Sequence, residues 1–144
     1  MKFHINPGIG VNNIAFGMHF TQVRRAVGAA YKLFRRGSEP VESEFYISQD
    51  LMTYYGAGGK LEAIEFAPPA ETVLFDTNLL ALNWAEVSDF LRAHGGDVED
   101  RGDGPILLKL GVGVWTPDAP YGPHAAVESV IVFAPGYYKR NPKA

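Results

Sequence analysis

The sequence predicts an α+β fold, a two-layer sandwich in which two helices cover one face of a single curved antiparallel sheet. Two stretches, 20–27 and 84–91, carry apolar residues at helical spacing, and segments rich in β-branched and aromatic residues follow each of them. The two helical stretches lie 64 positions apart, and segments 61–68 and 127–135 also resemble each other. We therefore expect two tandem repeats, each a helix followed by about three antiparallel strands.

The first helix is expected over residues 20–27. Phe20, Val23 and Val27 recur at i, i+3 and i+7, so they line one side of a helix. Gly28 follows, and a residue without a Cβ suits the left-handed conformation that ends many helices. The glycines of the preceding "NPGIGVNN" lack the third glycine of a dinucleotide-binding loop, which favours a Pro-Gly turn leading into a short strand.

The second helix has a clearer beginning. Asn83 is a good N-cap residue, and Glu86 three positions later completes the pattern of a capping box. Gly95 is expected to end this helix as Gly28 ends the first. The apolar positions that repeat the spacing of the first helix are Trp84, Val87 and Leu91.

Besides the short strand after the Pro-Gly turn, six segments read as strands, three in each half of the chain. They are 43–48, 51–56 and 61–67 in the first half, and 105–111, 112–116 and 127–134 in the second. Segment 66–78 contains two prolines and is expected to join the halves without taking part in strand pairing. We expect one domain, 1–144, with repeat-like halves of about 1–70 and 71–144.

Composition excludes several classes of protein. The 144 residues are 47% hydrophobic and 20% charged, as in an ordinary globular domain. A formal net charge of -3 argues against a general nucleic-acid binder. No apolar run approaches the length of a membrane span or a secretory signal, so a cytoplasmic location is expected. The absence of cysteine excludes disulfides, thiolate metal sites and a cysteine nucleophile.

No residue pattern predicts catalysis, a metal site or a cofactor. The four histidines are scattered without a partner at the spacing of a zinc-binding helix, and no serine lies in a nucleophile elbow. Five basic residues within 24–36 are read as a helix flank and a solvated loop, with a phosphate-binding patch as the alternative. We therefore expect a protein that is not an enzyme. The histidines are His4, His19, His94 and His124.

An acidic segment, "GDVEDRGDG", follows the second helix. Its carboxylates lack the alternation and the terminal glutamate of a calcium-binding loop, so a solvated turn is expected, with a cation site as the alternative. The same charges would suit a basic partner. The four acidic residues are Asp97, Glu99, Asp100 and Asp103.

Aromatic residues supply the other candidates for a partner-binding surface. Tyr54 and Tyr55 are adjacent on a predicted strand, so their side chains leave opposite faces and at most one joins the helix-covered core. The other tyrosine is expected on the open face or edge of the sheet, together with Trp115. Tyrosine and tryptophan are frequent anchors of protein interfaces.

The segments "INPGIGVNNIAFGMHFTQVRRAVG", "YYGAGGKLEAIEF" and "ESVIVFAPGYY" resemble small bacterial α+β proteins built on the tandem plan of β-lactamase inhibitory protein. In such proteins a turn, a strand and a helix ending in glycine precede an antiparallel meander. The chain departs from that inhibitor in having no cysteine. The resemblance implies a concave sheet that holds another protein, as in inhibitors and in immunity proteins that neutralise toxins.

The resulting hypothesis is a non-catalytic protein-binding module, specifically an immunity-type protein that neutralises a bacterial toxin by occlusion. The expected partner is a protein, a toxin domain in this hypothesis, and neither nucleic acid nor a membrane. The alternative is a small bacterial domain that binds a small molecule or acts as an enzyme. The sequence does not indicate an oligomeric state.

Overall fold

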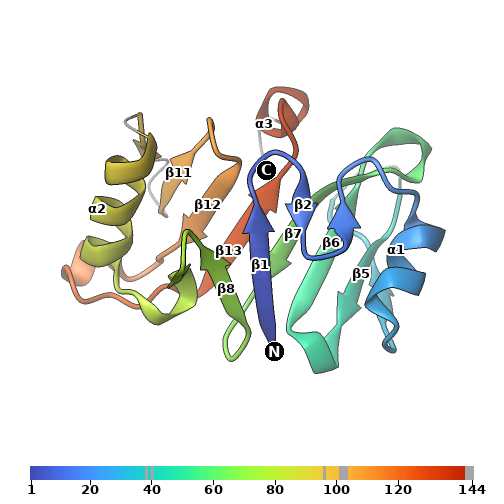
Figure 1. The fold of residues 1–144 in the computed structure, drawn as a ribbon, viewed down its shortest axis with the longest axis horizontal. Helices are drawn as coiled ribbons and strands as arrows, with labels where there is room; N and C mark the ends of the chain where they lie inside the picture. Colours follow the sequence, from blue (N-terminus) through green and yellow to red (C-terminus); the bar gives the residue numbers. More distant parts are fainter. Residues whose placement is uncertain (38, 40, 96, 101–103, 142–144) are drawn as a thin grey trace.

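The computed structural model describes residues 1–37, 39, 41–95, 97–100 and 104–141. In this part of the chain, an eight-stranded antiparallel sheet forms one layer of the molecule. The second layer consists of a five-stranded mixed sheet with a helix on each side of it, α1 (Phe20–Val27) and α2 (Trp84–Gly95) (Figure 1). A short third helix, α3 (Tyr137–Arg140), follows the last strand.

The large sheet has the strand order β10-β11-β12-β13-β7-β6-β5-β4. Each half of the chain therefore contributes four consecutive strands, and the halves meet where β13 pairs with β7, from Val130 opposite Phe66 to Phe133 opposite Ala63. The strands are β4 (Lys32–Phe34), β5 (Ser43–Tyr46), β6 (Leu51–Tyr55), β7 (Leu61–Phe66), β10 (Glu99–Asp100), β11 (Pro105–Leu107), β12 (Val112–Trp115) and β13 (Ser129–Phe133).

The small sheet lies over the middle of the large one, where β1 crosses the view in Figure 1. Its central pair is parallel, with Phe3 of β1 opposite Thr72 of β8. Residues of β1 alternate between exposed and buried, and Phe3 and Ile5 point into the core. The strands, in the order β3-β2-β1-β8-β9, are β1 (Lys2–Asn6), β2 (Gly10–Val11), β3 (Ile14–Ala15), β8 (Glu71–Leu74) and β9 (Thr77–Asn78).

The α+β class is confirmed, but a single curved sheet made of two repeats is wrong. Segment 66–78 is no unpaired connector, because Pro68 and Pro69 precede β8 and leave its ladder intact. The strands β8 and β9 join β1 in a sheet that the sequence prediction did not contain. The helices α1 and α2 lie on the same face of the large sheet, but the small sheet separates them, so they do not pack side by side (Figure 1).

Both long helices begin and end within a residue or two of the predicted positions. Gly28 has a φ of 65° and ends α1 in the left-handed conformation. At the start of α2, the backbone N–H of Glu86 donates to Asn83 Oδ1 at 2.9 Å and the backbone N–H of Asn83 donates to Glu86 Oε1 at 3.1 Å, which confirms the capping box. Gly95 is the last residue of α2, but the expected left-handed conformation is wrong, because Gly95 has no positive φ. Its small size instead suits the packing, since a Cβ there would lie 2.5 Å from the side chain of Leu107.

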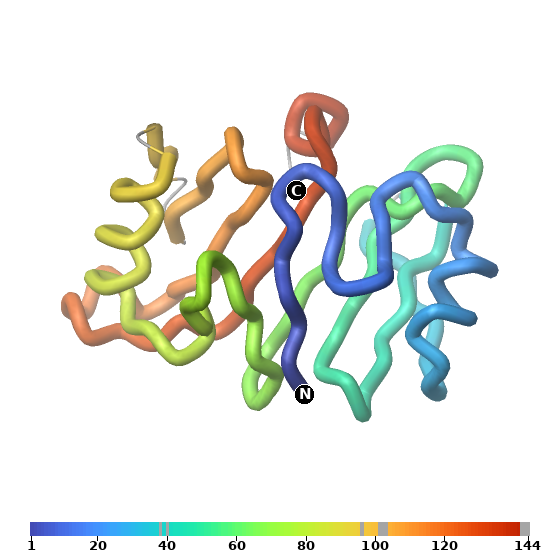
Figure 2. Tube along the Cα trace, in the orientation of Figure 1, coloured from blue at the N-terminus to red at the C-terminus, as the bar shows by residue number. Residues whose placement is uncertain are grey.

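Four single-turn 3-10 helices lie in the connections that the structure describes. They are η1 (Ile47–Gln49), η2 (Ala57–Gly59), η3 (Leu79–Ala81) and η4 (Ala119–Tyr121). Figure 2 shows that the two halves of the chain occupy opposite ends of the molecule, with β1 and β13 crossing near its middle.

The large sheet has apolar side chains on both faces. On one face, Val23 of α1 and Leu91 of α2 pack in the main core together with the small sheet. On the other face, a smaller cluster gathers Tyr54, Ile106 and Phe133 around Tyr137 of α3. We call this second face the open face, because α3 is the helix that packs on it among the described elements. The sandwich therefore leaves part of an apolar sheet surface uncovered.

Candidate protein-binding face

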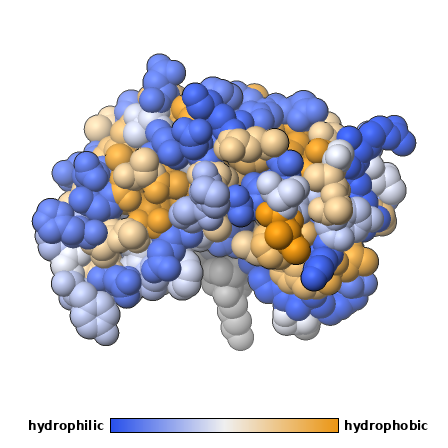
Figure 3. Space-filling model, turned by 90° about the horizontal axis from the view of Figure 1, so that it is seen from below, coloured by the Kyte–Doolittle hydropathy of each residue, from blue (hydrophilic) through white to orange (hydrophobic). Residues whose placement is uncertain are grey.

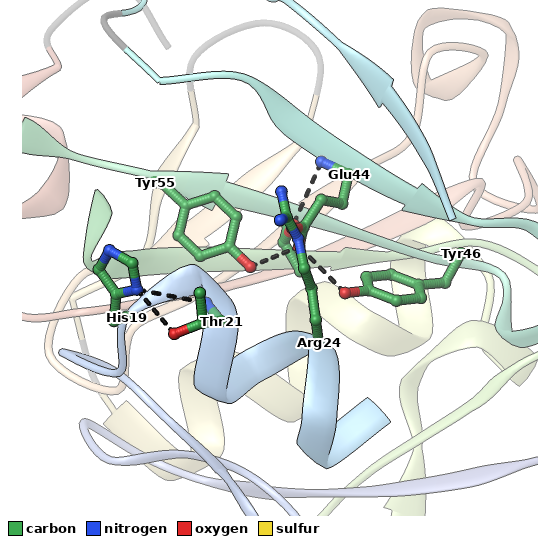
Figure 4. A network of polar contacts seen from close by, with 7 residues as sticks. His19, Thr21, Arg24, Glu44, Tyr46 and Tyr55 are labelled. Atoms are coloured by element: carbon green, nitrogen blue, oxygen red, sulfur yellow. Dashed lines mark hydrogen bonds and ion pairs between the residues drawn. The ribbon is translucent and has the colours of Figure 1, made fainter. Parts of the chain in front are cut away.

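Polar side chains form one cluster on each face of the large sheet. The cluster on the helix-covered face is centred on Glu44 of β5, which is fully buried (Figure 4). Its carboxylate forms an ion pair with Arg24 of α1 and accepts hydrogen bonds from Tyr55 at 2.5 Å, Thr53 at 2.9 Å and Tyr46 at 3.1 Å. Three strand hydroxyls and one helix guanidinium thus surround a single buried acid.

The Glu44 cluster attaches α1 to the sheet. The Arg24 guanidinium lies 4.6 Å from the centre of the Phe20 ring and 4.7 Å from that of Tyr31, so aromatic rings flank the cation that reaches the buried acid. A buried carboxylate is tolerated only when charge and hydrogen bonds compensate its lost hydration. Because Glu44 is fully buried and its ion pair with Arg24 joins β5 to α1, the cluster fixes the position of this helix on the sheet.

The second cluster lies on the open face and is centred on Glu65 of β7. The Tyr54 hydroxyl donates to its Oε1 at 2.5 Å, and the Ser129 hydroxyl donates to its Oε2 at 2.7 Å. These donors stand on β6 and β13, the two strands that flank β7. Each carboxylate oxygen is therefore held by a neighbouring strand, and the carboxylate has a fixed orientation.

Strand register places Glu65 in a continuous row across the open face. Residues directly opposite each other in a sheet share a face, and the pairings run through all eight strands. An acidic residue and a basic residue stand at the two ends of the row, and apolar residues lie on both sides of Glu65. The row is Glu99, Ile106, Gly113, Ile131, Glu65, Met52, Phe45 and Lys32.

The C-terminal helix covers one end of the open face. Arg36, after β4, stacks on the Tyr54 ring at 3.8 Å from its centre and donates to the Tyr137 hydroxyl at 2.6 Å. Arg36 also forms an ion pair with Glu39. These contacts hold α3 over Tyr54, whereas Ile131, Met52 and Phe45 of the central row remain partly exposed.

The structure separates the predicted partner-binding residues into accessible and inaccessible ones. Tyr55 packs in the main core and Tyr54 in the cluster on the open face, so the predicted alternation is confirmed. The expected exposure of one tyrosine is wrong, because α3 and Arg36 cover Tyr54 and both side chains are buried. Trp115 is 45% exposed and lies on the open face, opposite Ser129.

The acidic segment lies at the β10 edge of the large sheet. Asp97, Glu99 and Asp100 are exposed, whereas Asp103 lies outside the described residues. Glu99 stands opposite Ile106 and therefore lies on the open face, where Trp115 also lies. The fold thus brings one acidic residue and the predicted tryptophan to the same surface.

Sequence reasoning missed Glu65, although the pattern of its strand contained a signal. In "AIEF", Ile64 and Phe66 face the main core, and Ala63 and Glu65 face the opposite way. β7 carries two acids, Glu62 and Glu65. An acid that alternates with core-facing apolar residues, as Glu65 does, indicates a polar site on the second face. Because Ser129 and Tyr54 belong to other strands, the identity of its partners depends on tertiary pairing.

Burial raises the pKa of Tyr54 and of Tyr55, and the carboxylates of Glu65 and Glu44 that they contact raise it further. In the unfolded chain a tyrosine ionises near pH 10, before either residue does so in the folded protein. The raised pKa values therefore contribute to the free energy of unfolding in full below pH 10, and this contribution is lost as the pH rises above 10.

We expect this loss to reach about 1.3 kcal/mol per tyrosine between pH 9 and pH 11. Urea unfolding followed by circular dichroism at both pH values measures it. Between pH 9 and pH 11, the free energy of unfolding of Tyr54→Phe and that of Tyr55→Phe should each fall by about that much less than the free energy of unfolding of the parent protein. Equally steep losses in the parent and both variants would contradict the assignment.

The described residues contain no group of three or more histidine, cysteine, aspartate or glutamate side chains placed to hold a metal ion. Among the described helices, none has the length and apolarity that a membrane crossing requires. Comparisons with protein-family models, with curated proteins and with solved structures found no match to this chain. The resemblance to tandem inhibitor proteins therefore remains a prediction from sequence.

Proposed function

We propose that the protein is a non-catalytic binding module that holds a partner protein against the open face of its large sheet. Its proposed role is that of an immunity-type protein, which neutralises a bacterial toxin by occluding it. The observation that carries the proposal is the central row of the open face, where Ile131, Met52 and Phe45 stay partly exposed on a continuous sheet.

The open face has the composition of an interface centre. Apolar side chains on paired strands are fixed before binding, so a partner that covers them pays little conformational entropy. Trp115 adds a half-exposed aromatic ring beside the row, and such rings are common anchors of interfaces. Tyr54 contributes indirectly, by orienting Glu65 from below α3.

Other surfaces of the molecule are less suited to this role. The side seen from below in Figure 3 shows hydrophobic side chains in separate groups among hydrophilic ones. Such scattered groups are normal on soluble domains and need no partner. The open face is different because its partly exposed apolar residues lie in one row across paired strands, with Met52 directly opposite Phe45 and with Glu65 between Met52 and Ile131.

Charge favours a basic partner. The exposed Asp97, Glu99 and Asp100 stand at one edge of the large sheet, and the whole chain has a formal net charge of -3. Complementary charge at the rim of an interface accelerates encounter more than it strengthens the final complex. A toxin domain that binds nucleic acid would present the positive surface that fits this edge.

The proposal is tested by producing the chain together with each protein encoded next to it. We expect it to restore growth of cells that make a toxic neighbour, and to form a complex with that neighbour in size-exclusion chromatography. Trp115→Ala should raise the dissociation rate about tenfold or more. The matched control is Phe75→Ala, because Phe75 is 48% exposed but belongs to the β8–β9 turn of the other layer.

Replacing Asp97, Glu99 and Asp100 with lysine should mainly lower the association rate and weaken its dependence on salt. The fold should survive, since all three side chains are exposed. A partner whose binding neither Trp115→Ala nor the lysine variant affects would disprove the proposed surface. Failure to bind any neighbouring gene product would disprove the immunity role.

A further inference from the structure

We propose that Glu65 is the receptor for a basic side chain of the partner, and that an arginine fits it best. The inference rests on the proposed function, because it names the chemistry that the open face recognises. Glu65 stands at the centre of the apolar row, between Ile131 on β13 and Met52 on β6. An acid in that position needs a cation when a partner excludes water from the face.

The carboxylate of Glu65 is oriented but has no counter-ion among the described residues. Both of its bonds come from neutral hydroxyl groups, those of Tyr54 and Ser129. A carboxylate has acceptor sites for about four hydrogen bonds, so two donors leave room for more. Arg36 contacts the ring of Tyr54, but its own ion pair is with Glu39.

Three other glutamates on or beside the large sheet differ in this respect. Glu44 is paired with Arg24, Glu62 with Arg140 at 2.8 Å, and Glu39 with Arg36 at 2.6 Å. The fold thus supplies an arginine to each of these buried or partly buried acids, but within the described part of the chain it supplies none to Glu65. The missing cation is the feature that a partner can provide.

The surroundings of Glu65 favour arginine over lysine. A guanidinium donates two parallel hydrogen bonds to one carboxylate, and its planar group stacks on aromatic rings. Trp115 stands opposite Ser129, the residue that donates to Glu65, so a half-exposed indole lies on the same face as the acid. The aliphatic part of the arginine would contact Met52 and Ile131.

The proposal is tested with a small probe, N-acetylarginine amide, added to the ¹⁵N-labelled protein. The indole N–H resonance of Trp115 should shift and saturate in the millimolar range, as one charge-assisted contact predicts. N-acetylcitrulline amide, which has the same shape without the charge, should bind at least about fivefold more weakly. The indole resonance of Trp84, whose Nε1 is buried, serves as the internal reference.

The variant Glu65→Gln separates charge from shape. Glutamine keeps an acceptor for one hydroxyl and preserves the volume of the site, so the fold should remain and arginine binding should fall at least about fivefold. Glu71→Gln, an exposed residue of β8 in the small sheet, should leave arginine binding unchanged. Equal binding of both probes, equal binding to Glu65→Gln, or no shift of Trp115 would each overturn the arginine site.

These outcomes are independent of the search for a partner. A failed probe experiment would remove the arginine site but leave the open face able to bind a partner through its apolar row. Conversely, a failed search for a toxin would remove the immunity role but would not alter a measured affinity for the arginine probe.

Discussion

Arg24→Ala will lower the free energy of unfolding by about 3 kcal/mol. Removal of the guanidinium leaves Glu44 fully buried with hydroxyl partners but without a cation. Breaking a buried pair in this way typically costs about 3–5 kcal/mol, and the lower end applies because the Arg24 side chain is 29% exposed. Urea unfolding at pH 7, followed by circular dichroism, measures the change.

The neighbouring arginine supplies the control. Arg25 lies on the same helix but is exposed, and Arg25→Ala should change the free energy of unfolding by less than about 0.5 kcal/mol. In a Glu44→Gln background the acid no longer carries charge, so Arg24→Ala should cost no more than about 1.5 kcal/mol there. Equal costs for the two arginine variants would show that the buried acid does not depend on Arg24.

The helices could be predicted from sequence because their signals are local. Phe20, Val23 and Val27 define one side of α1, and the exchange of hydrogen bonds between Asn83 and Glu86 needs only four consecutive residues. Apolar spacing and capping depend only on residues within a turn or two, so they can be recognised without knowing how the rest of the chain folds.

The small sheet could not be predicted in the same way. Its central pair joins β1 to β8 across almost seventy residues, and no local pattern indicates which strand pairs with which. The β8–β9 turn also lacks the usual sequence pattern of a tight turn. Phe75 and Asp76 adopt φ values of 47° and 62°, in a region where asparagine and glycine are the usual residues. The alternation of "KFHIN" did indicate a strand, but its position over the centre of the molecule depends on tertiary contacts.

The candidate surface was predictable in part. The alternation of side chains along a strand correctly predicted that Tyr54 and Tyr55 face opposite ways. The burial of Tyr54 could not be predicted, because it is covered by Arg36 and by Tyr137, which lies more than eighty positions further along the chain. The exposed position of Trp115 could be predicted because an aromatic residue at the end of a strand is recognisable from the local sequence. Glu65 becomes notable only when β6, β7 and β13 lie side by side, since its two donors come from the flanking strands.

Glu65→Arg will weaken the complex with the proposed basic partner about a hundredfold or more, equivalent to about 2.7 kcal/mol. The substitution places a positive charge where we propose that a partner arginine binds, so attraction becomes repulsion at the centre of the apolar row. Surface plasmon resonance with the proposed partner measures the dissociation constant, and the free energy of unfolding of the variant shows whether the fold is intact.

Glu71→Arg is the matched control, because it changes the net charge by the same amount on the small sheet, in the other layer of the sandwich. Long-range attraction responds to net charge, so both variants should slow association to a similar, modest extent. Only a direct contact distinguishes them, and it should appear as faster dissociation of Glu65→Arg. Equal dissociation rates for the two variants would mean that the partner senses the overall charge of the protein and makes no contact with the acid on the open face.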